Sequence, residues 1–311
     1  MTPVGLVDDP LFLRHVPPRP HPERPERLTG VGEAVRRVLG TRVHSIAPRE
    51  ATRDELLRVH GAAYVDRVLS SVGRAWSIDS DTYLCAQTPH VALAAAGACI
   101  DAAEAVMRAH VGAAICLVRP PGHHAMPNRG MGFCIFNNVA VAAVTALAEE
   151  WARRVAVVDF DVHHGNGTQA MLWDLPEALY ISLHQWPLYP GTGRPEETGG
   201  ERAPGTNLNI PLAPGSGDDE YERAFVRQVM PALAAFGPDA LFLSAGYDAH
   251  ATDPMAGMAV TEGGYRDMAE RLASSANGRV ILVLEGGYAP AALKACLAAQ
   301  VGVLAGLHDS T

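Results

Sequence analysis

The sequence predicts an α/β protein built on a parallel sheet that is covered by helices on both faces. Short runs of Val, Ile and Leu alternate along the chain with alanine-rich segments of helical periodicity. Strands that are apolar at every position are buried on both faces, as they are in parallel sheets. No linker rich in Gly, Ser or Pro interrupts the 311 residues. We therefore expect a single domain, residues 1–311.

The predicted elements alternate along the chain after a proline-rich beginning. Residues 15–27 contain five prolines, too many for a helix, and are expected to form an ordered extended segment or loop. Mainly apolar runs of strand length predict strands at residues 114–118, 155–160, 179–183, 240–244 and 280–284. Apolar residues that recur every three or four positions predict helices at residues 91–108, 138–152, 220–236 and 262–275.

Composition excludes several classes of protein. A hydrophobic content of 48% excludes a disordered chain. The net charge of -9, from 25 basic and 34 acidic residues, speaks against direct binding of nucleic acid. It suits a cationic substrate, although solubility alone is the simpler explanation of this charge.

The cysteines, the amino terminus and the apolar segments indicate the cellular compartment of the protein. The five cysteines are odd in number and have no CxxC spacing, which is typical of reduced thiols. The amino terminus lacks the basic residues of a signal peptide, so we expect a cytoplasmic protein. The charge-free runs at 82–100 and 131–148 are expected to form buried helices with their flanks, and not membrane spans.

Polar residues, often with glycine, follow the end of each predicted strand. These segments are RPPGHH at 119–124, DFDVHHGNG at 159–167, LHQ at 183–185, SAGYDAH at 244–250 and EGGY at 285–288. Ligands of open parallel sheets bind beyond the carboxyl ends of the strands. We therefore expect these five segments to form one site.

The segment DFDVHH carries the strongest chemical signal. In an extended strand, Asp159, Asp161 and His163 share one face. Two buried carboxylates and an imidazole are costly unless a cation neutralises them. A buried salt bridge is the alternative, but no Arg or Lys occurs from 155 to 183. These oxygen and nitrogen ligands favour zinc or another borderline divalent ion.

Asp248 supplies a third ligand from the end of another predicted strand. By itself it would be interpreted as a helix N-cap or turn residue. Together with Asp161 and His163 it gives three protein ligands, and three ligands leave a coordination position open, as in catalytic zinc sites.

Three further residues have the chemistry of catalytic groups. His123 and His124 follow a rigid Pro-Pro-Gly turn, and near a metal-bound water one would act as general base and the other as acid or electrostatic partner. The alternative is a pair of ordinary loop histidines. Tyr288, on a Gly-Gly turn, could stabilise an oxyanion, although Gly-Gly-Tyr is also common in ordinary turns.

These motifs resemble the histone deacetylase superfamily, which includes acetylpolyamine amidohydrolases and bacterial histone deacetylase-like amidohydrolases. The resemblance extends over nearly the whole chain. The sequence is most similar to the class II branch, because Asn166 stands where class I enzymes usually carry Asp. The segments that carry it are HPERPERL, RPPGHHA, GFCIFNN, DFDVHHGNGTQ, SLHQ, LYPGTG, SAGYDAH with the following Asp253-Pro254, and EGGY.

The resemblance implies a three-layer α/β/α arginase–deacetylase fold with a mainly parallel eight-stranded sheet. It implies a catalytic zinc ion bound by Asp161, His163 and Asp248. It also implies a structural potassium ion held by side chains or backbone at Asp159, Asp161, His163, Ser182 and Leu183.

The same resemblance implies roles for the catalytic groups. His124 is the expected general base, polarised by Asn166, and His123 its electrostatic partner, held by Asp159. Tyr288 is expected to polarise the scissile carbonyl.

Residues of the substrate site are also implied. Gly132, Phe133 and Tyr189 correspond to the walls of a narrow acyl-lysine tunnel. Met255 stands where a polyamine-selective relative carries an acid, which disfavours polyamine selectivity. Asp79 and Asp81 are candidates for the loop aspartate that grips the substrate backbone in many relatives.

We therefore expect a zinc-dependent deacetylase that acts on an N-acylated primary amine, either acyl-lysine or a small N-acyl amine. An acetylpolyamine amidohydrolase is the alternative within the class, and a non-catalytic acyl-amine binding or scaffold protein is the alternative outside it. A ureohydrolase with two manganese ions would need more bridging carboxylates than these segments supply. The sequence leaves the oligomeric state and the choice of zinc or iron open.

Overall fold

A computed structural model describes residues 2–306, so the ends of the predicted domain, residues 1 and 307–311, lie outside the described part. Its main feature is an eight-stranded sheet of order β2-β1-β5-β10-β9-β6-β7-β8 in which every neighbouring pair is parallel. The strands are β1 (Val4–Val7), β2 (Val43–Ser45), β5 (Ala113–Cys116), β6 (Val155–Asp159), β7 (Ala178–Gln185), β8 (Asn207–Leu212), β9 (Ala240–Ala245) and β10 (Val280–Leu284). A separate antiparallel pair is formed by β3 (Trp76–Ser77) and β4 (Tyr83–Leu84).

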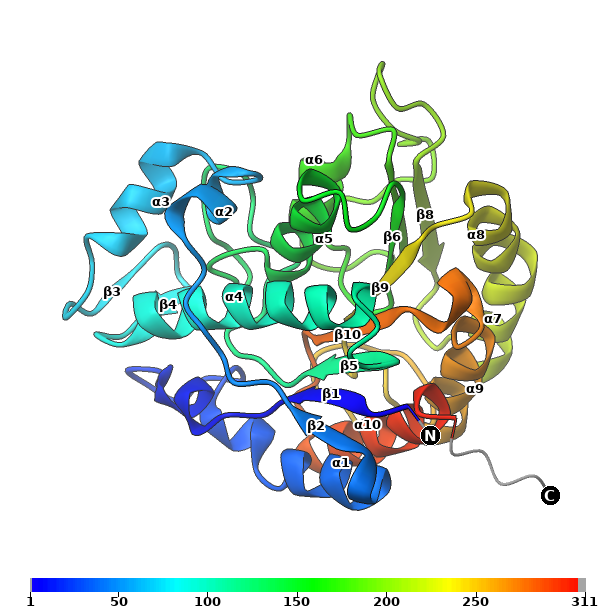
Figure 1. Cartoon of the computed structure of the whole chain (residues 1–311), viewed down its shortest axis with the longest axis horizontal. Coiled ribbons are helices and arrows are strands. Elements are labelled where there is room, and N and C mark those ends of the chain that lie inside the picture. The colour runs from blue at the N-terminus through cyan, green and yellow to red at the C-terminus, as the bar shows by residue number, and fades with distance from the viewer. Residues whose placement is uncertain (1, 307–311) are drawn as a thin grey trace.

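Helices cover both faces of the sheet (Figure 1). One apolar cluster packs α2 (Arg53–Leu57), α3 (Ala62–Leu69), α4 (Thr88–Met107) and α5 (Asn138–Ala148) against one face. The opposite cluster contains α1 (Val31–Leu39), α7 (Asp218–Ala224), α8 (Met230–Phe236), α9 (Glu262–Leu272) and α10 (Pro290–Leu304). Successive residues of β6 alternate between the two clusters, Val157 in the first and Val158 in the second. The predicted three-layer α/β/α architecture is therefore confirmed.

All five predicted strands exist, and they are neighbours in the sheet. They become β5, β10, β9, β6 and β7 in spatial order. The polar segments that follow them therefore meet at one edge, as predicted. The prediction for β7 was too short, because this strand continues through His184 and Gln185. The prediction for β6 was one residue too long, since Phe160 lies outside the strand.

The predicted helix at 220–236 is divided. It consists of α7, a π-helical turn at Phe225–Val229, and α8. Pro231 follows directly after the start of α8 and has no backbone N–H, so the regular i to i−4 bonding cannot continue through it.

The proline-rich segment is largely irregular, as predicted, and contains one 3₁₀ turn at Pro25–Leu28. Another 3₁₀ turn, Pro10–Arg14, directly precedes this segment, and one at Gly40–Arg42 directly follows α1. A further 3₁₀ turn lies at Ser275–Gly278.

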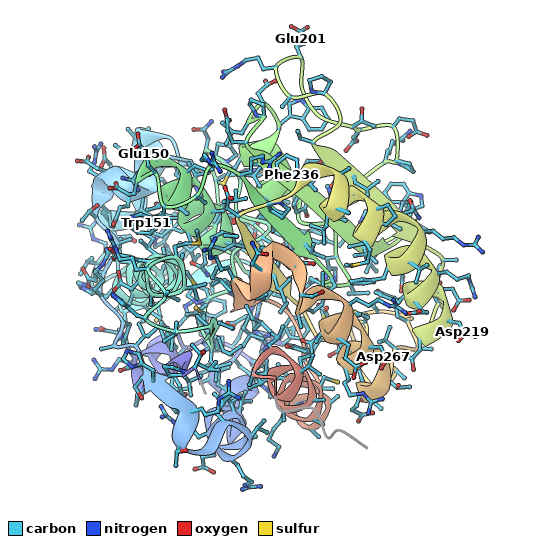
Figure 2. The ribbon with its side chains drawn as sticks, turned by 45° about the vertical axis from the view of Figure 1, so that its right-hand side comes forward. Glu150, Trp151, Glu201, Asp219, Phe236 and Asp267 are labelled. Atoms are coloured by element: carbon cyan, nitrogen blue, oxygen red, sulfur yellow. The ribbon has the colours of Figure 1, made fainter. Side chains whose placement is uncertain are left out.

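Burial explains the most apolar helix. Among the described residues, α4 is the helix whose length and composition would suit a membrane span, and 72% of its apolar window is buried inside the protein. Acidic side chains such as Glu150, Glu201 and Asp219 lie exposed at the surface, away from the core (Figure 2).

Candidate active site

Two carboxylates and an imidazole meet beyond the ends of β6 and β9. His163 Nδ1 lies 3.0 Å from Asp161 Oδ1 and 3.2 Å from Asp248 Oδ2. One ligand atom from each of these three buried residues lies within 4.8 Å of the others. Ligands of a tetrahedral zinc ion at 2.0–2.1 Å are separated by roughly 3.3 Å. The spacing of the three groups therefore fits one small divalent ion.

The backbone orients the two carboxylates. Asp161 Oδ2 accepts a hydrogen bond from Gly286 N at 2.8 Å, and Asp248 Oδ1 accepts one from Val162 N at 3.0 Å. Asp248 Oδ2 is buried and has no hydrogen-bond partner in the described protein. A Cβ on Gly286 would lie 2.2 Å from that oxygen, so only glycine fits here. An unsatisfied buried carboxylate oxygen beside an imidazole is consistent with a cation site.

The charges of this cluster point the same way. Burial alone would lower the pKa of His163, but its hydrogen bond with Asp161 and the negative charges of Asp248 and Asp161 outweigh burial and raise that pKa to about 10. Without a metal, the two acids therefore draw a proton onto the imidazole. A divalent ion would supply the same positive charge and displace that proton.

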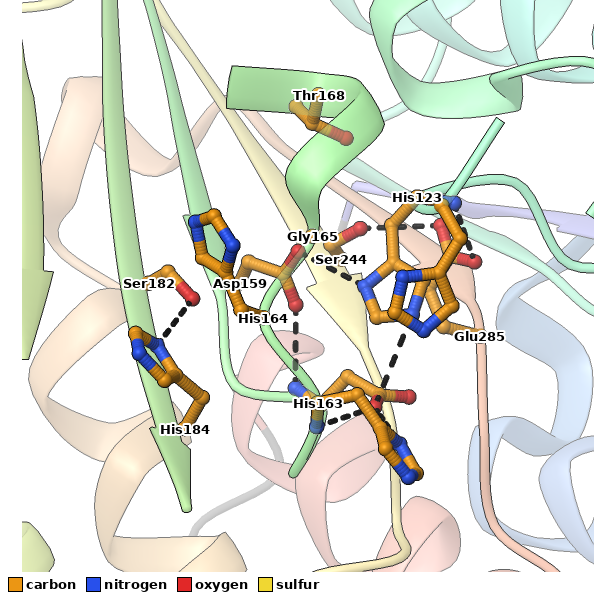
Figure 3. A network of polar contacts seen from close by, with 12 residues as sticks. His123, Asp159, His163, His164, Gly165, Thr168, Ser182, His184, Ser244 and Glu285 are labelled. Atoms are coloured by element: carbon orange, nitrogen blue, oxygen red, sulfur yellow. Dashed lines mark hydrogen bonds and ion pairs between the residues drawn. The ribbon is translucent and has the colours of Figure 1, made fainter. Parts of the chain in front are cut away.

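His123 lies directly behind this cluster. Its Nδ1 is 3.1 Å from Asp159 Oδ2, and its Nε2 is 3.8 Å from Asp161 Oδ1 (Figure 3). Asp159 is fully buried and also accepts a hydrogen bond from the Tyr180 hydroxyl. Burial would lower the pKa of His123, but Asp161 and Asp159 raise it to about 10, so this imidazole is held as a cation.

His124, in contrast, is neutral. Its ring lies 4.0 Å from the ring of His123, centroid to centroid, and its Nδ1 is 2.8 Å from Asn166 Oδ1. Burial, together with the charges of His123 and His163, places the pKa of His124 well below its usual value. A neutral imidazole with one nitrogen bonded to an amide oxygen is suited to accept a proton at the other.

One cavity of about 210 Å³ connects these groups to the surface. The predicted residues of the substrate site, Gly132, Phe133, Tyr189 and Met255, all line this cavity. Of the two candidate aspartates, Asp81 lines it and Asp79 does not. The lining residues are Asp81, Pro121, His123, His124, Gly132, Phe133, His163, Tyr189, Met255, Gly286 and Tyr288.

The loop that holds Gly132 and Phe133 is shaped by left-handed backbone. Gly132 has φ +55°, and a Cβ there would lie 2.5 Å from the His124 ring. Phe133 has φ 69°, a strained conformation for a bulky residue. Its ring lies 5.9 Å from that of Tyr288, and the Tyr189 ring meets His124 edge-on at 5.1 Å. These aromatic rings give the cavity apolar walls.

Asp253 fixes the loop that carries Tyr288. Its Oδ2 accepts hydrogen bonds from the backbone N–H groups of Tyr288 at 2.6 Å and Ala289 at 2.9 Å, and its Oδ1 accepts one from Met255 at 3.0 Å. One carboxylate therefore holds two residues of the cavity. The Asp253-Pro254 motif is visible in the sequence, but nothing in the sequence indicates this role of the aspartate.

A buried ionic cluster, for which the sequence predicted no function, also supports the site. Arg119 donates to Glu23 Oε2 at 2.7 Å, and both side chains are fully buried. Arg27 donates to the carbonyl oxygens of Glu285 and Gly287, and its guanidinium lies 4.7 Å above the Tyr288 ring. The repeated Glu-Arg pairs of the proline-rich segment were the available signal for this cluster.

Glu285 is a second buried acid without an assigned role from the sequence. It accepts hydrogen bonds from Gly122 N at 2.6 Å, His123 N at 3.1 Å and the Ser244 hydroxyl at 3.0 Å. It therefore ties the end of β10 to the turn that presents both histidines.

The residues of the predicted potassium site lie on β6, β7 and the segment between them. Asp159 and Ser182 are register partners on β6 and β7, and both are fully buried. The Ser182 hydroxyl is 3.0 Å from His184 Nδ1 (Figure 3). Leu183 follows Ser182 within β7.

Comparisons with known proteins agree with this geometry. The model of the histone deacetylase domain matches residues 21–304. A probable deacetylase of Archaeoglobus fulgidus is 39% identical over 291 residues, which cover 91% of this chain and 81% of that protein. A histone deacetylase-like amidohydrolase of Pseudomonas aeruginosa is 39% identical over 313 residues, which cover 98% of this chain and 81% of the relative.

The fold of this chain is also similar to that of a solved structure. The crystal structure of the HDA15 HD domain matches with a TM-score of 0.92 at 38% identity, covering 98% of this chain and 90% of that one. The predicted arginase–deacetylase fold is thus confirmed, and so is the predicted resemblance. The chain belongs to the histone deacetylase family, and its activity is that of a deacetylase or related amidohydrolase acting on N-acylated amines.

Proposed function

We propose that this protein is a zinc-dependent amidohydrolase that removes an acetyl or other acyl group from an N-acylated primary amine, either acyl-lysine or a small N-acyl amine. The observation that carries the proposal is the meeting of three groups at one cavity: a carboxylate–imidazole–carboxylate cluster whose imidazole lines the cavity, a pair of histidines of which one is charged and one neutral, and a tyrosine.

Asp161, His163 and Asp248 would hold the metal ion. Their oxygen and nitrogen donors suit zinc, and three ligands leave a position open. When bound, zinc supplies Lewis-acid chemistry: it polarises a carbonyl and lowers the pKa of water.

The two histidines would divide the proton chemistry. His124 is neutral, and its Nε2 accepts a proton from water as the water attacks the amide carbon. The imidazolium of His123 stabilises the negative charge that develops beside it. A protonated histidine then gives its proton to the leaving amine as the C–N bond breaks, which leaves a carboxylic acid and a free amine; the acid then transfers its proton to the amine or to solvent.

Tyr288 would stabilise the oxyanion. Burial raises the pKa of its phenol well above the usual value, so the group stays protonated and can donate a hydrogen bond at neutral pH. Arg27 above its ring adds a positive charge close to the same place.

The shape of the cavity favours an extended methylene chain. Phe133 and Tyr189 give apolar walls, and Asp81 places an acid among the lining residues, where it would interact with a cationic or amide-bearing substrate. Met255 contributes a neutral side chain, which favours acyl-lysine over acetylated polyamines.

A structural potassium ion near Asp159 and Ser182 is also part of the proposal. Asp159 and Ser182 are fully buried register partners on neighbouring strands, and both side chains carry oxygen ligand atoms. A thermal unfolding midpoint that rises with potassium but not with an equal concentration of lithium would support it.

The test of the proposed function is release of acetate from an acetyl-lysine peptide. We expect turnover that a chelator abolishes and that added Zn²⁺ restores, and reconstitution with Fe²⁺ or Mn²⁺ in parallel identifies the preferred metal. An Asp248→Asn variant, which keeps the size of the side chain, should lose both the metal and the activity.

A panel of substrates separates the alternatives. Acyl-lysine peptides of increasing acyl length and N-acetylputrescine would be compared by kcat/KM. A large preference for N-acetylputrescine would make the protein an acetylpolyamine amidohydrolase. Absence of turnover with every acyl-amine, despite bound metal, would favour an acyl-amine binding or scaffold protein instead.

A further inference from the structure

The side chain of Asn166 lies between His124 and two methionine sulfurs. Its Oδ1 is 2.8 Å from His124 Nδ1, while its Nδ2 donates to Met126 Sδ at 3.1 Å and contacts Met131 Sδ at 3.5 Å. Both methionines are half-buried and line a second cavity of about 540 Å³, which shares no lining residue with the substrate cavity. The amide therefore joins the histidine to a place outside the substrate site.

The sulfurs distinguish the two ends of the amide. A carboxamide has a donor end and an acceptor end, which exchange places when the group rotates by half a turn. A thioether sulfur accepts hydrogen bonds and donates none. Met126 and Met131 can therefore pair with the NH₂ group of Asn166, but they repel its oxygen. They favour the one orientation in which the oxygen faces His124.

This orientation decides where the proton of neutral His124 resides. With the amide oxygen at Nδ1, the ring carries its single proton on Nδ1 and keeps a free electron pair on Nε2. A reversed amide would present N–H to Nδ1 and move the proton to Nε2. That tautomer cannot accept a proton from water in the cavity.

We infer that Met126 and Met131 are positioning residues that fix the tautomer of His124 through Asn166. The inference rests on the proposed function, in which Nε2 of His124 is the base. The two thioethers would lower the barrier of the proton-transfer step without touching the substrate.

The test begins with the metal-loaded double variant Met126→Leu/Met131→Leu. Leucine keeps nearly the same volume but offers no electron pair. We expect kcat on acetyl-lysine peptide to fall by about 10-fold, with KM and bound metal unchanged, because neither methionine lines the substrate cavity.

Met171→Leu is the matched control. Met171 lies on the helix that begins with Asn166, α6 (Asn166–Leu172), but it lines neither cavity.

A double-mutant cycle separates positioning from packing. Asn166→Asp replaces the amide by a carboxylate that has no N–H to donate. In this background the two leucine substitutions should have no further effect on kcat, whereas a role in packing alone would give the same loss in both backgrounds.

Nitrogen NMR gives a measurement that does not depend on activity. In the metal-loaded protein we expect a protonated Nδ1 and an unprotonated Nε2 for His124, assigned by the loss of its signals in His124→Gln. The double leucine variant should show a mixture of tautomers, and the single variant Met126→Leu is used if the double variant does not fold.

The outcomes are distinct. An unchanged kcat with an unchanged tautomer in the leucine variants would overturn the inference, as would an equal loss in the Asn166→Asp background. If the natural protein hydrolyses no acyl-amine, the proposed function fails, and the tautomer measurement still decides the role of the methionines.

Discussion

At the scale of single residues, Tyr288 has the clearest separable role. It lines the cavity beside the metal-binding cluster but is not one of the residues of that cluster. Its phenol is kept protonated by burial, and Arg27 lies over its ring. Binding of metal and stabilisation of the oxyanion therefore depend on different side chains.

Replacing Tyr288 by Phe tests this separation. We expect unchanged metal content and a fall in kcat by about 10² or more, because one hydrogen-bond donor to a developing oxyanion is lost. Metal analysis and steady-state kinetics on acetyl-lysine peptide measure both quantities. Turnover within a few-fold of the natural protein would contradict the role of this phenol.

At the scale of elements, loops that follow different strands hold one another in register. The segment after β9 supplies Asp253, whose carboxylate accepts from the backbone of Tyr288 and Ala289 after β10. The carboxylate of Glu285 makes the equivalent link from β10 to the turn after β5. The positions of catalytic groups therefore depend on hydrogen bonds between loops as well as on the sheet.

Asp253→Ala tests the first of these links. The alanine side chain accepts none of the three hydrogen bonds, so the backbone of Tyr288, Ala289 and Met255 loses this support. We expect kcat to fall by about 10-fold while bound metal is unchanged, measured by kinetics and metal analysis.

Asp239→Ala is a matched control for this variant. The Asp239 carboxylate also accepts from two consecutive backbone N–H groups, those of Arg153 and Arg154, but at the opposite end of β6 and β9 from the site. It should change the free energy of unfolding and leave kcat unaltered. Equal effects of both variants on kcat would show that Asp253 has no special connection to Tyr288.

At the scale of the whole molecule, buried histidines govern the dependence of stability on pH. His60 is buried, its Nε2 accepts from Asn137 N at 3.0 Å, and its Nδ1 faces the Met126 carbonyl oxygen at 3.2 Å. This arrangement suits only the neutral ring. Burial lowers the pKa of His60 to about 4, and burial likewise lowers the pKa of His15 to about 4.

The sign of the effect follows from these pKa values. Between about pH 6.5 and pH 4 the unfolded chain binds protons at His15 and His60 that the folded protein does not. The free energy of unfolding therefore falls as the pH falls through this range, by on the order of 3 kcal/mol for each histidine. The carboxyl of Glu23, whose pKa is lowered to about 2 because Arg119 outweighs the cost of burial, adds a further loss below pH 4.5.

Urea unfolding at a series of pH values measures this dependence. His60→Gln keeps a donor and an acceptor but cannot be protonated, so the variant should lose less stability between pH 6.5 and pH 4 than the natural protein. An identical slope for the two proteins would contradict the assignment of a neutral His60.

The sequence by itself determined the class of fold and most of the site. Apolar runs located the five central strands, because burial on both faces leaves a continuous pattern that is local in the chain. The outer strands β1, β2 and β8 were not located from this pattern. Asp161, His163 and Asp248 were selected by residue type at strand ends, and the prediction that these residues meet agrees with their positions.

Only the tertiary structure decided which distant residues support that site. Arg27 donates a hydrogen bond to the carbonyl oxygen of Gly287, in the loop of Tyr288, which lies 260 positions further along the chain. Asn166, at the start of α6, donates to the sulfurs of Met126 and Met131 in the segment between β5 and α5. Such contacts cannot be predicted from a local pattern. Strand order and loop packing bring the two side chains together, and the residues next to each of them in the sequence do not indicate which partner it will contact.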